Sequence, residues 1–492
     1  MIRCIISLFV AIAATTVSLA REATVLSLSL PEVMARARKN SVDAEVALNQ
    51  LKSSYWAYRS YRAELLPEVS FNATLPAYRK QYSSYMESNG SFSFVPNNYL
   101  QMNGELSVSQ NIWLTGGKIA VNSSLDFLRQ LDGAPYNRYL SIPVAVTLTQ
   151  PIFGVNAMKW DRKIEPVRYN EAKANFLSAT EDVALTAINL YFSLLMAQEN
   201  HEIAVKNLEN SERLYEVAKM KREMGQISQN DLLQMELNLL NARTDMTDCE
   251  SDLKSNVFAL RSFLDYGENV EIKPVIPLDV PRVEISYADA LDKALTNNQF
   301  AKKMLRLQLE ADYEVAKAKG AQREINMFMQ FGYTGTDRTL PSSYSNLRGN
   351  QIVEVGFQIP LVDWGHRKGK VKVAESNRRL IASQVRQENM NFSQNLFILV
   401  ERYSNQLRQL ETARRADEIA QRRYATNVET FLIGKISTLD LNDSRVKKDE
   451  ARREYINELY MFWNYYYQIR SLTLWDYEKN TGIDADFDAL MR

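Results

Sequence analysis

The sequence has very little of the side-chain chemistry that most enzymes use. Its 492 residues include only two histidines and two cysteines, and one cysteine stands at position 4. Zinc, iron–sulfur and thiol sites need several such ligands, so the chain offers almost no material for them. It also shows no Ser/His/Asp or Cys/His set and no phosphate-binding glycine loop. We therefore expect no enzyme activity, metal or cofactor, and interpret His201, His366 and Cys249 as structural or solvated residues.

Net charge and helix-breaking residues are also scarce. The 59 lysines and arginines balance 59 aspartates and glutamates, so no excess positive charge attracts nucleic acid and we expect no such partner. The 17 glycines and 13 prolines are too few for a collagen-like or low-complexity chain. Since hydrophobic residues make up 46% of the sequence, it has ample material for a folded protein.

A long apolar run occurs only at the N-terminus. Arg3 precedes the apolar run 4–14, and the polar stretch that follows ends in Ser-Leu-Ala at 18–20. This pattern predicts a signal peptide over 1–20, cleaved after Ala20, because the run is too short to cross about 30 Å of hydrocarbon as a membrane helix. No cysteine stands at the junction to accept a lipid, and Cys249 alone cannot form an intramolecular disulfide.

The rest of the chain contains two halves built on one plan. The segment 225–232, GQISQNDL, returns as GKISTLDL at 434–441, and Pro151 corresponds to Pro360, each with an offset of 209 residues. Segment 28–40 resembles 285–297 at an offset of 257, which places a 48-residue insertion in the first half. We predict a first repeat over 21–272, a proline-bearing linker over 273–283, a second repeat over 284–475 and a C-terminal tail over 476–492.

Each half contains long stretches without glycine or proline. Residues 167–224 and 371–433 are two such runs of 58 and 63 residues. As helices they would be roughly 85–95 Å long, too long for one compact globule. A further uninterrupted run follows each Gly-x-Ile-Ser segment. The sequence therefore predicts two helical hairpins, at 161–266 and 371–475, that pack as coiled coils.

Shorter segments alternate apolar and polar residues. This period predicts strands near 67–76, 105–126, 141–153, 325–334 and 351–361, and the second segment reads as a hairpin with a Gly-Gly turn. One apolar and one small polar face suit a membrane barrel, although a half-buried soluble sheet has the same alternation. The export signal, the long helices and the aromatic residues at strand ends favour the barrel. Those aromatic residues, Trp113, Phe153 and Trp364, either form a girdle at the membrane interface or simply pack against other parts of the protein.

The duplicated order of helix, strands, long helix, Gly-x-Ile-Ser turn and returning helix resembles the TolC-type outer-membrane channel family of Gram-negative bacteria. The resemblance covers about residues 24–475. It implies a mixed α/β membrane protein in which three copies form an outer-membrane β-barrel, continued by a long periplasmic α-helical barrel. It also implies a homotrimer in outer-membrane lipid, a periplasmic membrane-fusion adaptor, and an inner-membrane pump of the RND, ABC or MFS type.

Closing a barrel from so few strands per chain requires several copies of the chain. An open sheet edge in lipid leaves backbone groups unpaired at several kcal/mol each, and four or six strands cannot close a water-filled barrel alone. The family's usual four strands per copy would give twelve in the trimer. The extra hairpin over 105–126 either joins the wall, giving eighteen strands, or decorates the extracellular rim with the Tyr- and Asn-rich loop 76–99.

The resemblance further implies the functional residues. Gly225, Ile227 and Ser228, with Gly434, Ile436 and Ser437, correspond to periplasmic tips where an adaptor docks, each with an exposed isoleucine. Glycine and serine also simply end one helix and cap the next. Asp440 and Asp443, with Asp231 in the first repeat, correspond to carboxylates that gate the tunnel, or else they stabilise helix N-termini. Pro151 and Pro360 mark the strand-to-helix junctions.

These implications define a functional hypothesis with two alternatives. The chain is interpreted as the outer-membrane channel of a tripartite efflux or type I secretion system, a passive duct opened by adaptor contact. A non-conducting coiled-coil envelope scaffold or adhesin is the first alternative. A periplasmic enzyme is the second, and it would require a polar pocket for which the sequence gives no signal.

Overall fold

The computed structural model describes residues 24–88, 90–132, 135–322, 325–357, 362–433 and 435–491. The signal peptide predicted over 1–20 lies outside these residues, as do Gly434 and Pro360. The chain forms two compact units, which are described separately. One contains the chain up to Gln50, Ala174–Asn298 and everything from Phe392 onward, and the other contains Leu51–Lys173 and Gln299–Asn391.

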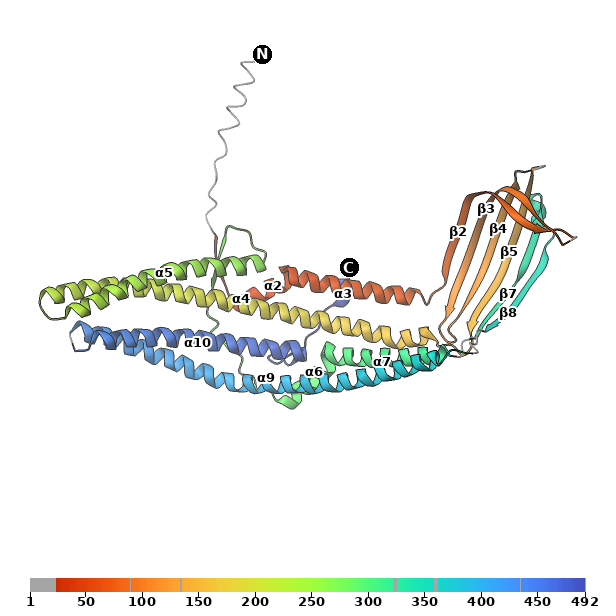
Figure 1. The fold of residues 1–492 in the computed structure, drawn as a ribbon. Coiled ribbons are helices and arrows are strands. Elements are labelled where there is room, and N and C mark those ends of the chain that lie inside the picture. Colours follow the sequence, from red (N-terminus) through yellow and green to blue (C-terminus); the bar gives the residue numbers. More distant parts are fainter. Residues whose placement is uncertain are drawn as a thin grey trace, which may run out of the picture. The chain divides into compact units, whose positions relative to one another are not determined.

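The first unit is helical, and long helices dominate it (Figure 1). Its helices are α2 (Leu30–Asn40), α5 (Gln229–Phe263), α6 (Tyr287–Asn297), α10 (Thr438–Thr473) and the later parts of α4 (Ala157–Glu223) and α9 (His366–Leu432). Strand β9 (Trp475–Asp476) leads into the predicted tail, which contains strand β10 (Thr481–Gly482) and the short helix α11 (Phe487–Leu490). None of the helices in the described ranges is both long enough and apolar enough to cross a bilayer.

The repeat seen in the sequence also relates the helices. Helices α4 and α9 each have 67 residues, and their bounds differ by the same offset of 209. Helices α2 and α6 have 11 residues each, and α3 (Val42–Ala63) and α7 (Gln299–Gly320) have 22 each, with bounds that differ by 257. The two halves therefore build matching helices residue for residue.

A short parallel sheet, which the sequence pattern did not predict, joins the start of the chain to the segment between the repeats. Strand β1 (Thr24–Leu28) pairs with β6 (Val270–Pro274), so β6 extends into the predicted linker 273–283. The Tyr191 hydroxyl of α4 accepts a hydrogen bond from Val275 N–H (2.9 Å) and lies 3.2 Å from the carbonyl oxygen of Leu28. One buried side chain thus holds both strands against α4.

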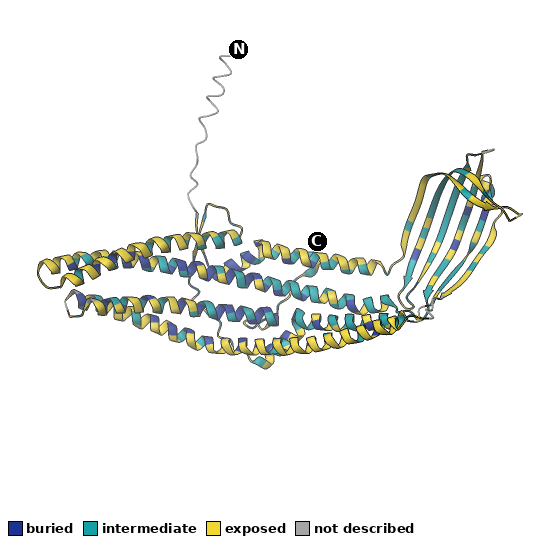
Figure 2. Ribbon diagram, in the orientation of Figure 1, coloured by how far each residue is buried: buried dark blue, intermediate teal, exposed yellow. Residues whose placement is uncertain are grey.

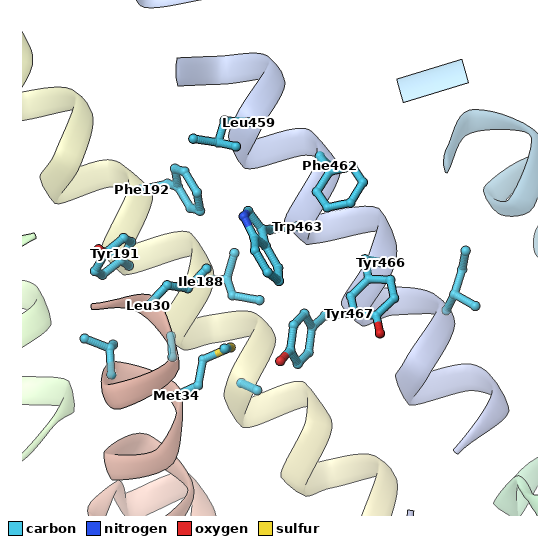
Figure 3. Packing of buried hydrophobic residues seen from close by; sticks show 14 of the residues in the cluster. Leu30, Met34, Ile188, Tyr191, Phe192, Leu459, Phe462, Trp463, Tyr466 and Tyr467 are labelled. Atoms are coloured by element: carbon cyan, nitrogen blue, oxygen red, sulfur yellow. The ribbon is translucent and has the colours of Figure 1, made fainter. Parts of the chain in front are cut away.

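Aromatic side chains form the core of this unit between α2, α4 and α10 (Figure 3). Buried residues gather midway along α4 and in the second half of α10, whereas the hairpin ends are largely exposed (Figure 2). The largest buried members include Leu30, Ile188, Leu194, Leu195, Tyr191, Tyr403, Phe462 and Tyr466. Burial of apolar surface stabilises a fold by roughly 25 cal/mol per Å², and these side chains are large and fully buried. This core therefore contributes strongly to the stability of the unit.

A buried ion-pair chain crosses the same core. Glu181 of α4 is only 2% exposed and lies between two arginines, Arg38 of α2 (2.7 Å) and Arg470 of α10 (3.2 Å). Arg470 also pairs with Asp476 of β9 at 2.7 Å. Each charge has a partner, which is the condition under which buried ions are tolerated.

The second unit contains one antiparallel sheet of six strands in the order β2-β3-β4-β5-β7-β8 (Figure 1). The strands are β2 (Glu68–Met86), β3 (Phe92–Ile112), β4 (Gly117–Gln130), β5 (Tyr136–Pro151), β7 (Ile325–Asp337) and β8 (Arg348–Phe357). The part of α3 from Leu51 onward, α7, the first parts of α4 and α9, and the short α8 (Leu340–Ser343) complete the unit. The extra hairpin of the first half is therefore part of the sheet.

The prediction of a loop over 76–99 is wrong. Strands β2 and β3 stay paired out to Met86 and Phe92, so they have 19 and 21 residues. Pro76 is accommodated at a register shift between Thr74 and Ala77, and Pro96 lies beyond Tyr99, where β3 no longer pairs with β4. Both are positions where a missing N–H does not break a sheet.

Candidate functional site at the hairpin turns

Both helical hairpins close with the same backbone hydrogen bond. In the first, Gln226 N–H donates to the carbonyl oxygen of Lys221 at 2.8 Å, and Gly225 between them has φ +71°. In the second, Lys435 N–H donates to the carbonyl oxygen of Thr430 at 3.1 Å. This six-residue closure needs a left-handed residue just past the helix end, which explains the glycine at position 225.

A serine then caps the returning helix in each hairpin. Asp231 N–H donates to Ser228 Oγ (3.1 Å), while Ser228 N–H (3.0 Å) and its hydroxyl (2.7 Å) donate to the Asp231 carboxylate. Ser437 and Asp440 repeat the arrangement, with the hydroxyl donating at 2.6 Å and Asp440 N–H at 3.2 Å. Asp231 and Asp440 thus act first as partners in capping boxes.

The same hydrogen bonds set the charge of these two aspartates. Bonds from the side chain and backbone of Ser228 lower the pKa of Asp231 below its ordinary value, and Ser437 lowers the pKa of Asp440 in the same way. Hydrogen bonding to a carboxylate favours its charged form. Both turns therefore present ionised carboxylates at neutral pH, each at a helix N-terminus that favours negative charge.

The isoleucines of the two turns are not the exposed contacts that the sequence led us to expect. Ile227 and Ile436 are half-buried and pack against a small hydrophobic cluster that joins the two hairpins. The buried members of this cluster are Ala218, Met235, Phe431 and Leu441. The isoleucines point inward because this cluster offers them apolar neighbours that come from both repeats.

A lysine adds a second connection between the two hairpins. Lys221 Nζ donates to the carbonyl oxygen of Phe431 (3.4 Å), and the same ammonium lies 5.0 Å from the centre of the Phe431 ring. Together with the shared hydrophobic cluster, this contact holds the end of α4 against the end of α9. The two turns of one chain therefore form a single packed end.

Different apolar side chains are exposed beside the turns. Met224, Ile433 and Leu439 flank the two Gly-x-Ile-Ser segments, and Leu439 is 76% exposed. Sequence reasoning missed them, although each lies within two residues of a motif position. They form an exposed apolar surface beside the turns.

Asp443 has a partner of its own on the neighbouring helix. Its carboxylate lies 2.8 Å from Arg423 Nη2 of α9, and both side chains are about half exposed. At the equivalent positions of the first repeat, 209 residues earlier, stand Leu214 and Gln234. The ion pair is therefore a feature of the second hairpin and not a product of the duplication.

At the strand-to-helix junctions of the second unit, two aromatic residues adopt left-handed backbone conformations. Pro151 ends β5, and Phe153 follows with φ +62°; Trp364, before α9, has φ +50° and is 95% exposed. Positive φ is uncommon for such bulky residues. Trp113 is different because Arg162 covers its ring at 4.1 Å. Phe153 and Trp364 are both exposed at these junctions.

The remaining candidates form no reactive group. Cys249 is half-buried, and burial raises the pKa of its thiol, which disfavours the reactive thiolate. Within the described ranges, no group of three His, Cys, Asp or Glu residues is arranged to hold a metal ion.

Comparison with known proteins points to one family. Residues 33–264, just under half of the chain, match the model of the family described as outer membrane efflux protein. No curated protein sequence matches the chain.

Solved structures of membrane proteins share the fold of this efflux protein. The CmeC outer membrane channel of Campylobacter jejuni has a TM-score of 0.66 at 15% identity, covering 94% of this chain and 88% of that one. A membrane protein from Pseudomonas aeruginosa gives 0.65 at 11% identity, covering 90% of each chain. The open state of the MtrE outer membrane channel of Neisseria gonorrhoeae gives 0.60 at 13%, covering 92% and 89%.

The family match and the fold together confirm the expected fold class and location. The efflux protein is an outer-membrane channel of the TolC type with a periplasmic helical tunnel, and its family is one of transport proteins, not enzymes. Members of the family form trimeric channels in tripartite efflux systems.

Proposed function

We propose that this outer membrane efflux protein is a passive homotrimeric export duct, opened when a periplasmic adaptor binds its hairpin turns. An inner-membrane pump of the RND, ABC or MFS type supplies the energy in a tripartite efflux or type I secretion system. The observation that carries the proposal is the single packed end made by the two turns. Because Ile227, Ile436 and Lys221 tie the hairpins together, a partner that binds one turn also moves the other.

Docking uses the exposed residues beside the motifs. Met224, Ile433 and Leu439 supply apolar contact area. Ser228 and Ser437 cap the returning helices and so keep each turn in one conformation. Helical hairpins commonly recognise partner helices through such apolar anchors. The glycines and serines of the motif therefore shape the docking end, and their neighbours make the contact.

Photo-cross-linking tests this docking surface. A photoreactive amino acid at Leu439 or Met224 is expected to capture the adaptor in intact cells, because both positions are exposed beside a turn. Ile419 of α9 is exposed as well but lies 15 residues before position 434, and it serves as the control. Equal capture of the adaptor at Ile419 and Leu439 would remove the turns from the docking surface.

The gate of the proposed duct is the acidic set Asp440 and Asp443. In a trimer each residue is present three times around the tunnel axis, and Arg423 neutralises Asp443 in each copy. This pair also joins α9 to α10, so it holds the second hairpin closed upon itself. Loss of Asp443 leaves three unpaired guanidinium groups that repel one another, which favours a wider aperture.

Single-channel recording in planar bilayers tests duct and gate together. We expect low conductance for the wild-type trimer and a several-fold increase for Asp443→Ala or for Asp440→Ala with Asp443→Ala. Gln234→Ala alters the equivalent position of the first repeat and should leave conductance unchanged. Unaltered conductance and antibiotic susceptibility in the aspartate variants would reject the gating role. Protein that never conducts, even with both aspartates replaced, would favour the scaffold alternative.

A further inference from the structure

The β3–β4 hairpin, which makes this sheet six-stranded, is built into the end of the sheet that carries the helices. Asn156, which caps α4, donates from Nδ2 to the carbonyl oxygens of Trp113 (2.9 Å) and Leu114 (3.1 Å) in the β3–β4 turn. Gln110 Nε2 near the end of β3 donates to the carbonyl oxygen of Leu65, just after α3 (2.8 Å). The turn therefore lies where α3 ends and α4 begins, and the hairpin is not a decoration of the opposite, extracellular rim.

One face of the sheet carries an unbroken apolar row through this hairpin. Val69, Val108, Val121, Val146 and Phe331 are successive register partners across β2, β3, β4, β5 and β7. All five are exposed, with 38–67% of each residue accessible. Exposed apolar residues in one row across neighbouring strands suit contact with lipid, not water.

The next row along the strands faces the other way and is small or polar. It consists of Ser70, Ser107, Asn122, Ala145 and Gly332. The Ser107 hydroxyl donates to Asn122 Oδ1 at 2.6 Å. On this same face, Asn103 Nδ2 donates to Asp126 Oδ1 at 2.9 Å. In these two rows, strands β3 and β4 thus have the same two faces as β2, β5 and β7.

We infer that β3 and β4 are wall strands and that the trimer encloses an eighteen-stranded barrel. The inference rests on the homotrimer of the proposed function. Strands β2 and β8 are the edges of the sheet, and three copies can satisfy these edges by pairing β8 of one copy with β2 of the next.

Strand number sets the width of the outer opening. Barrel diameter grows roughly linearly with strand number, so eighteen strands give an opening about 1.5 times as wide as twelve. Barrels of 16–18 strands hold an open aqueous channel. The outer end of this duct therefore admits bulky hydrated cargo, and any tighter selection by size lies elsewhere along the tunnel.

Site-directed fluorescence of the full-length protein tests whether the hairpin is in the wall. Single cysteines are placed at Val108, Ser107, Val121 and Asn122 in a Cys249→Ser background, and the protein is reconstituted into phosphatidylcholine vesicles. Bimane at 108 and 121 is expected to be quenched several-fold more by doxyl-labelled lipid than bimane at 107 and 122. Cysteines at 107 and 122 are expected to react with a membrane-impermeant thiosulfonate.

Positions 146 and 147 of β5 serve as the reference pair. Quenching at Val146 together with free aqueous labelling at Val108 and Val121 would overturn the inference and leave the channel intact. Absence of lipid quenching at Val146 would overturn the membrane channel itself, and with it this inference. Electron cryomicroscopy of the trimer in lipid nanodiscs then counts the wall strands, with eighteen expected and twelve contradicting the inference.

Discussion

Replacement of Arg470 by methionine is expected to lower the free energy of unfolding of the helical unit by about 3–5 kcal/mol. Arg470 is 8% exposed and pairs with both Glu181 and Asp476. Without it, Asp476 loses its ion-pair partner and Glu181 keeps only Arg38. Breaking one side of a buried ion pair is costly because the remaining charge stays desolvated. Urea unfolding of the purified trimer, followed by far-ultraviolet circular dichroism, measures the loss.

Two further variants separate this effect from a general loss of packing. Arg414 of α9 pairs with Glu411 at 2.9 Å but is half exposed, so Arg414→Met should cost less than about 1 kcal/mol. Arg470→Met combined with Asp476→Asn removes the unpaired carboxylate and should recover part of the lost stability. If Arg470→Met unfolds at the same urea concentration as Arg414→Met, the buried chain of charges does not stabilise this core.

A charge on the apolar face of the sheet is expected to have a comparable effect. Phe331 lies midway along β7 and is exposed on the lipid-facing row, so Phe331→Arg should destabilise the membrane-inserted barrel by about 2–4 kcal/mol per copy. The cost arises because the guanidinium must be held among acyl chains near the middle of the bilayer. Trimer yield after refolding into vesicles, and its resistance to urea, measure the effect.

The neighbouring residue supplies the matched control. Gln330 precedes Phe331 in the same strand and points to the opposite, polar face, because successive side chains alternate across a sheet. Gln330→Arg should therefore refold with yields close to wild type. Equal damage from both arginines would mean that the two faces of β7 do not differ in their contact with lipid, and it would contradict the placement of Phe331 against the membrane.

The fold class could be read from the sequence because its strongest signals are local. Runs without glycine or proline are visible along the chain, and the 209-residue offset that relates the turns also relates the bounds of α4 and α9. The lengths of the strands could not be predicted in this way, because they depend on pairing with other strands. The segment 76–99 looks like a loop by its asparagines and prolines, yet it pairs because β2 and β3 supply each other with partners. The pairing of β1 with β6 joins residues about 246 positions apart and leaves no local pattern.

The turns show the same division between local and distant information. Ser228 and Ser437 could be recognised as helix caps because capping depends on residues three positions away. The inward direction of the Ile227 side chain could not be predicted from the sequence, because its apolar neighbours include Phe431 from the other repeat. The Arg423 partner of Asp443 stands 20 residues away across a hairpin, and only the comparison with Leu214 and Gln234 marks the pair as special.

The matched lengths of α4 and α9 limit how this gene can change. Both helices have 67 residues, and their far ends are packed together by Ile227, Ile436 and Lys221. One added residue advances a helix end by about 1.5 Å and rotates it by about 100°. An insertion in a single copy of the duplicated segment would therefore shear the joined ends apart. Length variants of such a duct are tolerated only in pairs, with the same number of residues gained or lost in each half.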